Sequence, residues 1–335
     1  ITGVEAVADK LLEILRRPLS VNGTTFEVRG SLGIACYPGG GSTADGLVTS
    51  ADAAMYRAKQ AGGDCYAFHT PELNASREER RFVLRALRNA DDRGELSVFL
   101  QPIIEAVTGR LTGAEILLRW YSGEHGWIEP DRFIPIAEET GQIREIGATA
   151  LRRACSLAAT WQATGLRVPP ISVNVSSVQL AAPDFPDQVL EVLAETGLSR
   201  AALVIEITET TFMADDPRIA SALERLRAHD VGIAIDDFGV GYSSLAYLKR
   251  FPADRIKLDR EFVGVEADAA GNVPIIESVV ALGRAFRGTV VAEGVEREEE
   301  AKQLRELGVG ELQGFLFGHP MDPAEFERIW LRAEG

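Results

Sequence analysis

Apolar residues recur along this chain at the spacings of both helices and strands. Residues 2–17 and 44–62 carry apolar side chains at helical intervals, and glycines follow the second segment. Residues 24–37 and 65–68 have the composition and pattern of β-strands. Together these segments predict part of an α/β domain over residues 1–70.

A polar link follows and runs into an amphipathic helix. In residues 71–94, Phe82, Leu84 and Leu87 lie on the apolar side of the predicted helix. We interpret residues 71–94 as a helical linker that acts as a semi-rigid connector.

From residue 95 onward, short apolar strands alternate with helical patterns. The predicted strands are residues 96–103, 111–118, 171–175, 203–208, 231–237, 254–259, 289–295 and 311–317. Helical patterns such as residues 218–230 lie between most of them, as βα units require. Eight such strands predict an α/β fold, an irregular (β/α)8 TIM-like barrel over residues 95–335. The irregularity is expected at its start, because residues 105–110 are short enough to form a hairpin instead of a helical crossover.

Composition narrows the class of protein. The 335 residues are 46% hydrophobic, which can build a large core, and the formal net charge is −15. This charge argues against binding a nucleic-acid polymer through a basic face and against contact with an acidic membrane surface. The three cysteines, Cys36, Cys65 and Cys155, lack metal-ligand spacing and read as thiols of a reducing compartment.

The segment is expected to be cytoplasmic, whether or not a preceding part attaches the full protein to a membrane. No apolar run approaches the length of a membrane span, and the first residues do not resemble a signal peptide. The chain starts without Met and inside a helical pattern, so we interpret it as an excerpt of a longer protein.

Polar residues stand at or near the carboxyl end of each predicted barrel strand. They are Glu115, Asn174, Glu206, Asp236 with Asp237, Lys257 with Asp259, Glu293 and Gln313. In a barrel of this topology those ends meet at one face, where the carboxylates would repel one another unless divalent cations neutralised them. Oxygen ligands without His or Cys favour Mg²⁺ or Mn²⁺ over Zn²⁺.

The adjacent carboxylates in the stretch VGIAIDDFGVGYSSL, residues 231–245, have several interpretations. Taken alone, Asp236 and Asp237 suit an Asx-type turn, and the glycines that follow suit a phosphate cradle. Taken with the other strand ends, one aspartate can bridge two metals while its neighbour binds the second. Two metals beside Lys257 fit phosphodiester hydrolysis, and a metal-dependent lyase or isomerase with Lys257 as base stays open.

A series of motifs runs along residues 95–330 in the order QPIIEAVTGRLTGAEILLRW, FIPIAEETGQI, SVNVSSVQL, IEITET, IDDFGVGYSSLAYL, IKLDREFV, VVAEGVE and LQGFLFGHP. These motifs resemble those of the EAL family of cyclic di-GMP phosphodiesterases. Upstream, GSLGIACYP and ADAAMYRAKQAGGDCYAF resemble the C-terminal half of a GGDEF (diguanylate cyclase) domain, without the signature motif.

The EAL resemblance implies roles for particular residues. It implies two Mg²⁺ or Mn²⁺ ions, one held by Glu115, Asn174, Glu206 and Asp236, the other by Asp236, Asp237 and Glu293. Lys257 would contact or deprotonate the attacking water, and Gln313 would hold water or phosphate near the ions. The positions that match substrate-gripping residues are Gln101, Leu118 and Arg119. Glu209 would brace the loop after Asp236, with Glu296 beside it.

The resemblance also implies cyclic di-GMP as ligand, 5′-pGpG as product and a homodimer formed through the EAL domain. Ca²⁺ is expected to bind and inhibit, since it takes more ligands at longer distances than Mg²⁺. A non-hydrolytic cyclic di-GMP receptor is the alternative, although the metal ligands and the lysine are all retained. Departures from the family pattern are Ile116 for an alanine, Val240 in the loop, and GGD at residues 62–64 in the GGDEF-like region. Phe99 and Tyr247 are interpreted as core residues more readily than as a wall for guanine.

Overall fold

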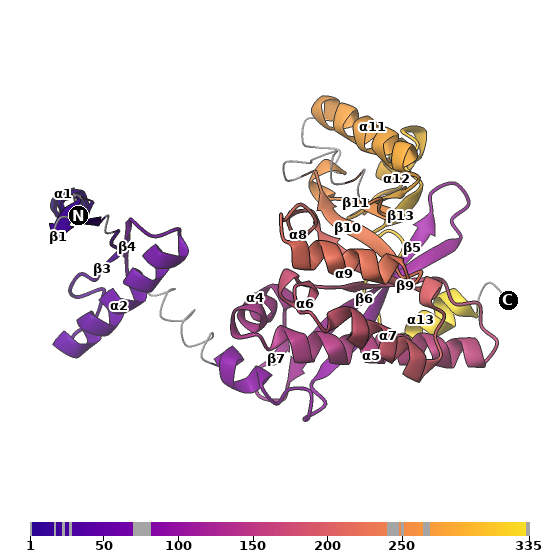
Figure 1. The fold of residues 1–335 in the computed structure, drawn as a ribbon, viewed down its shortest axis with the longest axis horizontal. Coiled ribbons are helices and arrows are strands. Elements are labelled where there is room, and N and C mark those ends of the chain that lie inside the picture. Colours follow the sequence, from indigo (N-terminus) through magenta and orange to yellow (C-terminus); the bar gives the residue numbers. More distant parts are fainter. Residues whose placement is uncertain are drawn as a thin grey trace. The chain divides into compact units, whose positions relative to one another are not determined.

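A computed structural model provides the structure of the chain (Figure 1). It describes residues 2–16, 18–21, 24–26, 29–69, 82–239, 248, 251–263 and 269–332. By their contacts the residues form two compact units, Ile1–Ala86 and Leu87–Gly335.

The first unit is a small α/β arrangement. Its elements are α1 (Thr2–Leu15), β1 (Leu19–Val21), β2 (Thr24–Phe26), β3 (Leu32–Ile34), α2 (Ala44–Gln60) and β4 (Tyr66–Phe68). Strands β1 and β2 pair antiparallel. Strand β3 pairs parallel with β4, and α2 lies between these two strands in the sequence. Gly33 allows α2 to approach β3, because a Cβ there would lie 1.8 Å from the carbonyl oxygen of Ala51. The predicted β-like run over residues 24–37 is thus two separate strands.

The second unit is built on a closed barrel. Its strands are β5 (Leu96–Glu105), β6 (Leu111–Ser122), β8 (Ile171–Asn174), β9 (Leu203–Thr208), β10 (Gly232–Phe238), β11 (Arg255–Leu258), β12 (Thr289–Ala292) and β13 (Glu311–Gln313). Their order is β5-β13-β12-β11-β10-β9-β8-β6, and the β5–β6 pairing closes the ring among the described residues. The predicted irregular (β/α)8 barrel is confirmed.

The irregularity lies where the sequence predicted it. Strand β5 runs antiparallel to both β6 and β13, whereas the other neighbours in the ring are parallel. The short connection over residues 105–110 leaves no room for a crossover helix, so β5 and β6 form a hairpin. A further short strand, β7 (Gly126–Ile128), pairs with the far end of β6 outside the ring.

Helices cover the outside of the barrel (Figure 1). They are α4 (Pro130–Thr140), α5 (Ile143–Ala163), α6 (Ser177–Leu180), α7 (Phe185–Thr196), α8 (Glu209–Phe212), α9 (Pro217–Arg227), α11 (Ala269–Phe286), α12 (Glu298–Glu306) and α13 (Pro323–Phe326). Buried apolar residues of these helices and of the outward strand positions form one continuous core. No helix in the described part of the chain is both long and apolar enough to cross a lipid bilayer.

An ion pair closes the end of the barrel where the parallel strands begin. Arg255 donates from Nε to Glu311 Oε2 at 2.8 Å and from Nη2 to Glu311 Oε1 at 3.1 Å, and both side chains are buried. Arg255 Nη2 also donates to the carbonyl oxygen of Thr112 at 2.9 Å. Gly113 makes room for the guanidinium, since a Cβ there would lie 3.0 Å from Nη2. Several donors of the buried arginine are therefore paired.

Replacing this arginine should destabilise the barrel strongly. Arg255→Ala leaves the Glu311 carboxylate buried without its partner, which costs about 3–5 kcal/mol of unfolding free energy. The exposed pair Arg218–Asp216 provides a control, and Arg218→Ala should lower the unfolding free energy far less than Arg255→Ala does. Denaturant unfolding of both variants measures the difference. Equal losses of unfolding free energy in the two variants would show that the buried Arg255–Glu311 pair stabilises the fold no more than an exposed pair does.

Candidate active site

The ammonium group of Lys257 lies at the centre of a carboxylate cluster at the opposite end of the barrel. Lys257 belongs to β11, and its side chain is 1% exposed. Its Nζ atom lies 2.6 Å from Glu293 Oε1, 2.9 Å from Glu206 Oε2, 3.1 Å from Glu115 Oε2 and 3.3 Å from Asp236 Oδ1. These acids come from β6, β9, β10 and the residue after β12. The structure therefore brings residues distant in sequence onto one cation.

Side-chain amides complete the inner part of the cluster. Asn174 donates to Glu115 Oε1 at 2.6 Å, and Gln313 donates to Glu115 Oε2 at 2.6 Å. Gln313 Nε2 also lies 3.1 Å from Gln101 Oε1, and Gln101 donates to the carbonyl oxygen of Gly318 at 3.1 Å. Both oxygens of Glu115 are thus held by donors, and its orientation is well determined.

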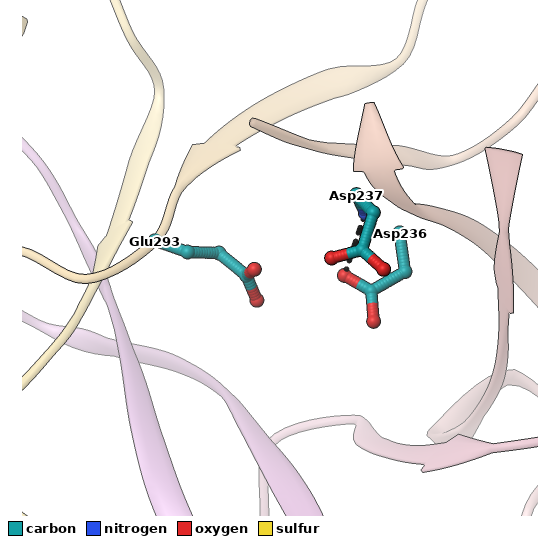
Figure 2. A group of neighbouring side chains, drawn as sticks. All are labelled: Asp236, Asp237 and Glu293. Atoms are coloured by element: carbon teal, nitrogen blue, oxygen red, sulfur yellow. Dashed lines mark hydrogen bonds between the residues drawn. The ribbon is translucent and has the colours of Figure 1, made fainter. Parts of the chain in front are cut away.

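Asp236, Asp237 and Glu293 form the outer part of the cluster. One carboxylate oxygen of each lies within 4.8 Å of the others, and Figure 2 shows the two aspartates side by side with Glu293 opposite them. The backbone N–H of Asp237 donates to Asp236 Oδ1 at 3.1 Å. Asp237 is exposed, whereas Glu206 and Lys257 are buried, so the cluster opens to solvent on the Asp237 side.

A break in strand β10 lets two adjacent aspartates face the same site. Successive side chains of a regular strand point to opposite faces. The register of β10 with β11 shifts between Ile235 and Phe238, and Asp237 has φ +54°. Such a bulge turns the second aspartate toward the first, and aspartate tolerates the left-handed conformation better than most residues.

Burial and mutual repulsion shift the acidity of the cluster. Burial raises the pKa of Glu293 to about 8 and that of Glu206 to about 7, although Lys257 opposes both shifts. Burial, together with the charges of Asp236 and Asp259, raises the pKa of Asp237 to about 6. For Glu115, burial acts in the same direction, but Lys257, Gln313 and Asn174 outweigh it and lower the pKa. A single ammonium therefore does not fully compensate the acids that surround it.

Two open acceptor atoms show that the cluster can take additional cations. Glu206 Oε1 and Gln313 Oε1 are buried, and neither accepts a hydrogen bond from any residue that the structure describes. Buried acceptors of this kind normally have a partner. Their chemistry, together with the surrounding carboxylates, is the oxygen donor set of hard divalent ions. The residues present therefore fit Mg²⁺ or Mn²⁺.

Residues predicted around the cluster have different placements. Glu209, the first residue of α8, accepts a hydrogen bond from the backbone N–H of Gly239 at 2.9 Å, where β10 ends. Glu296 is exposed, and its backbone N–H donates to Glu300 Oε2 at 2.9 Å. Val240 and Tyr247 lie outside the described residues. The roles assigned to these residues stay predictions.

The substrate-gripping positions separate onto the two faces of β6. Arg119 shares the face of Glu115 by strand alternation. Burial lowers the pKa of its guanidinium, and the charges of Glu129 and Glu115 oppose that shift. Leu118 lies on the other face and packs against the core, and its carbonyl oxygen accepts a hydrogen bond from Arg119 at 2.9 Å. Ile116 is also buried in that core, away from the cluster. The structure therefore brings Arg119, but not the Leu118 side chain, to the face of the site.

Asp259 is a neighbour of the cluster to which the sequence assigned no role. It caps the helical turn Arg260–Phe262 by accepting from the N–H of Glu261 at 2.7 Å, and its charge raises the pKa of Asp237. The sequence feature that indicates a place near the cluster is its position directly after β11, since the carboxyl ends of the strands meet at this face.

Comparisons with known proteins agree with this geometry. The sequence profile of the EAL domain matches residues 84–320, and that of the diguanylate cyclase GGDEF domain matches residues 2–65. The bifunctional diguanylate cyclase/cyclic di-GMP phosphodiesterase MucR of Pseudomonas aeruginosa is 42% identical over 319 residues, which are 95% of this chain and 46% of MucR. The chain thus spans about half the length of this relative.

Solved structures show the same fold. The PaMucR phosphodiesterase in complex with c-di-GMP superposes with a TM-score of 0.70 at 42% identity, over 73% of this chain and 99% of that one. A calcium and cyclic di-GMP complex of Klebsiella pneumoniae BlrP1 has a TM-score of 0.59 at 31% identity, over 68% of this chain and 56% of that one. The EAL profile matches more than half of the residues, and MucR is 42% identical over 95% of this chain. The chain therefore belongs to the EAL domain family.

Proposed function

We propose that the chain hydrolyses cyclic di-GMP to linear 5′-pGpG with the help of two divalent ions. The observation that carries this proposal is the convergence of four carboxylates on buried Lys257, with open acceptors on Glu206 and Gln313. The descriptions of MucR as a cyclic di-GMP phosphodiesterase and of a c-di-GMP complex of PaMucR support the choice of substrate.

The cluster divides naturally between two ions. Glu115, Asn174, Glu206 and Asp236 would hold the inner one, and Asp236, Asp237 and Glu293 the outer one, with Asp236 shared. When bound, such ions polarise the phosphate and acidify the attacking water. The bulge in β10 serves this division because it points both aspartates at the same space.

Lys257 acts as a cation in the arrangement seen. Burial alone would lower its pKa, but the carboxylates around it raise the pKa well above the usual value. An ammonium can donate to the attacking water and stabilise charge on phosphate, whereas proton abstraction from carbon needs a base with a lowered pKa. This geometry favours a phosphodiesterase over a lyase or isomerase that uses Lys257 as base. Lys257 would accept a proton only if cations displaced it from the carboxylates.

The remaining groups bind and orient the phosphodiester. The Gln313 and Gln101 amides lie beside Glu115, and Arg119 on the same face can pair with a non-bridging phosphate oxygen. Water adds to phosphorus, the bond to the ribose 3′ oxygen breaks, and that oxygen takes a proton. The product carries a 5′-phosphate and a free 3′-hydroxyl, which is 5′-pGpG. Formation of a homodimer through the EAL domain is part of the same proposal.

Metal identity tests the proposal as a whole. Purified protein should convert cyclic di-GMP to 5′-pGpG with Mg²⁺ or Mn²⁺, whereas Ca²⁺ should support binding without turnover, as its longer ligand distances disturb the attack geometry. Chromatography of the products and calorimetry of binding, at matched metal concentrations, measure both. Binding without hydrolysis under every metal would instead indicate a receptor, and equal turnover with Ca²⁺ would mean that the ions only screen charge.

Asp236→Asn should reduce turnover by about two orders of magnitude or more, because the shared carboxylate would lose its charge toward both ions. Asp187→Asn is a suitable control, since Asp187 pairs with Arg225 on the surface away from the cluster. Steady-state kinetics with saturating Mg²⁺ give the comparison. Near wild-type kcat in Asp236→Asn would refute the shared-ligand assignment.

Lys257→Ala should leave cyclic di-GMP binding in Ca²⁺ within about threefold of wild type and reduce kcat by about 10²-fold or more. The physical reason is that Lys257 is assigned to water and phosphate, while the acids are assigned to the metals. Lys302→Ala on α12 controls for the loss of a lysine. The assignment is wrong if the variant loses metal binding and its rate recovers fully with excess metal.

A further inference from the structure

The open end of the β5–β6 hairpin, opposite its turn, extends beyond the barrel on the side of the carboxylate cluster. Strand β8 pairs with β6 only over Ala114–Ile116, and β13 pairs with β5 only over Ile103–Glu105. The remaining part of β6, through Ser122, pairs with β5 and β7. Glu115 therefore lies at the barrel rim, and the strand that carries it continues past the site.

One face of this projecting hairpin is aromatic. Gln101 and Glu115 are directly paired, and by alternation Phe99, Arg119 and Tyr121 lie on their face. Further along, Tyr121 is the direct partner of Trp127 in β7. The face of the catalytic cluster thus continues without interruption into an aromatic wall, which we define as Phe99, Tyr121 and Trp127.

The wall is held together by ring contacts. The Trp127 ring lies 5.8 Å from the Phe99 ring and 5.2 Å from the Tyr121 ring, both in edge-to-face geometry. The guanidinium of Arg119 lies 5.9 Å from the centre of the Phe99 ring. Contact with Phe99 shows that the indole leans back along the hairpin toward the site.

The two faces of the hairpin differ in how far their side chains are exposed to solvent. On the opposite face Trp120 is 0% exposed and packs edge-to-face on Phe133 of α4. On the site face Tyr121 is 51% and Trp127 is 53% exposed. Tyr121 and Trp127 of the aromatic wall are therefore open to solvent beside the cluster, whereas Phe99 is half-buried.

We propose that Trp127, backed by Phe99, is the stacking platform for one guanine base of the dinucleotide. This inference rests on the proposed function and names a specificity-determining residue of the same site. Phe99 is two residues from Gln101, about 7 Å along the strand, and Trp127 lies next to it. That span suits a base whose own phosphate is bound at the cluster.

The chemistry of the wall favours a purine over an apolar protein segment. Arg119 lies on the same face as the acids and close to the Phe99 ring, so a phosphate and an aromatic ring can be bound by neighbouring groups. Stacking of a base on an aromatic side chain contributes about 1–3 kcal/mol, and it adds to phosphate binding without taking part in bond breaking. The platform should therefore affect KM much more than kcat.

Three substitutions of Trp127 test the platform. Trp127→Ala and Trp127→Leu should raise the KM for cyclic di-GMP about 5- to 100-fold with kcat within about twofold, and Trp127→Phe should retain most of the affinity. Leu preserves apolar bulk but has no π-face, so it separates stacking from simple burial. Tyr56→Ala on α2 controls for the loss of a partly exposed aromatic residue elsewhere.

A second substrate separates base recognition from damage to the hairpin. Methyl 4-nitrophenyl phosphate is a phosphodiester without a purine, and its kcat/KM should change little in Trp127→Ala. Equal losses for both substrates, or an unchanged KM for cyclic di-GMP, would overturn the platform. An inactive wild-type protein would refute the proposed function itself, and direct calorimetry of cyclic di-GMP binding would then still decide on the platform.

Discussion

Buried charge is the constraint on which the functional end of this barrel depends. An ammonium group inside a protein is stable only where acids surround it, and Lys257 contacts four of them. The same acids are too many for one cation, as the raised pKa values of Glu206 and Glu293 show. The site is therefore poised to take more positive charge, which is the property expected of a centre for divalent ions.

The two ends of the barrel use charge differently. Arg255 and Glu311 pair through two hydrogen bonds, with Thr112 as a further acceptor, so that end is a closed structural contact. At the other end, acceptors on Glu206 and Gln313 are open, and exposure increases toward Asp237. Paired charge stabilises the fold, whereas incompletely compensated charge is available for ligands. This division matches the general rule that barrel function lies at the carboxyl ends of the strands.

The antiparallel first strand adds a feature that a regular barrel lacks. Because β5 returns directly into β6, the hairpin can be longer than the ring requires and can extend past the rim. Its site face carries Arg119 and the aromatic wall, while its other face is sealed by α4. The hairpin, together with the short strand β7 that pairs with β6, thus supplies a metal-ligand candidate, a phosphate-binding candidate and an aromatic surface.

The sequence alone determined the eight barrel strands, the hairpin at residues 105–110 and the kinds of ligand atom at the strand ends, because these depend on local period and residue type. Only the tertiary structure decided which groups meet. The bulge that turns Asp237 toward Asp236 depends on pairing with β11, and the open position of Tyr121 and Trp127 depends on where β8 and β13 stop pairing. Alternation predicts that Leu118 and Arg119 oppose each other, but not which of them faces the acids. Such outcomes depend on contacts between distant segments, which a local pattern does not encode.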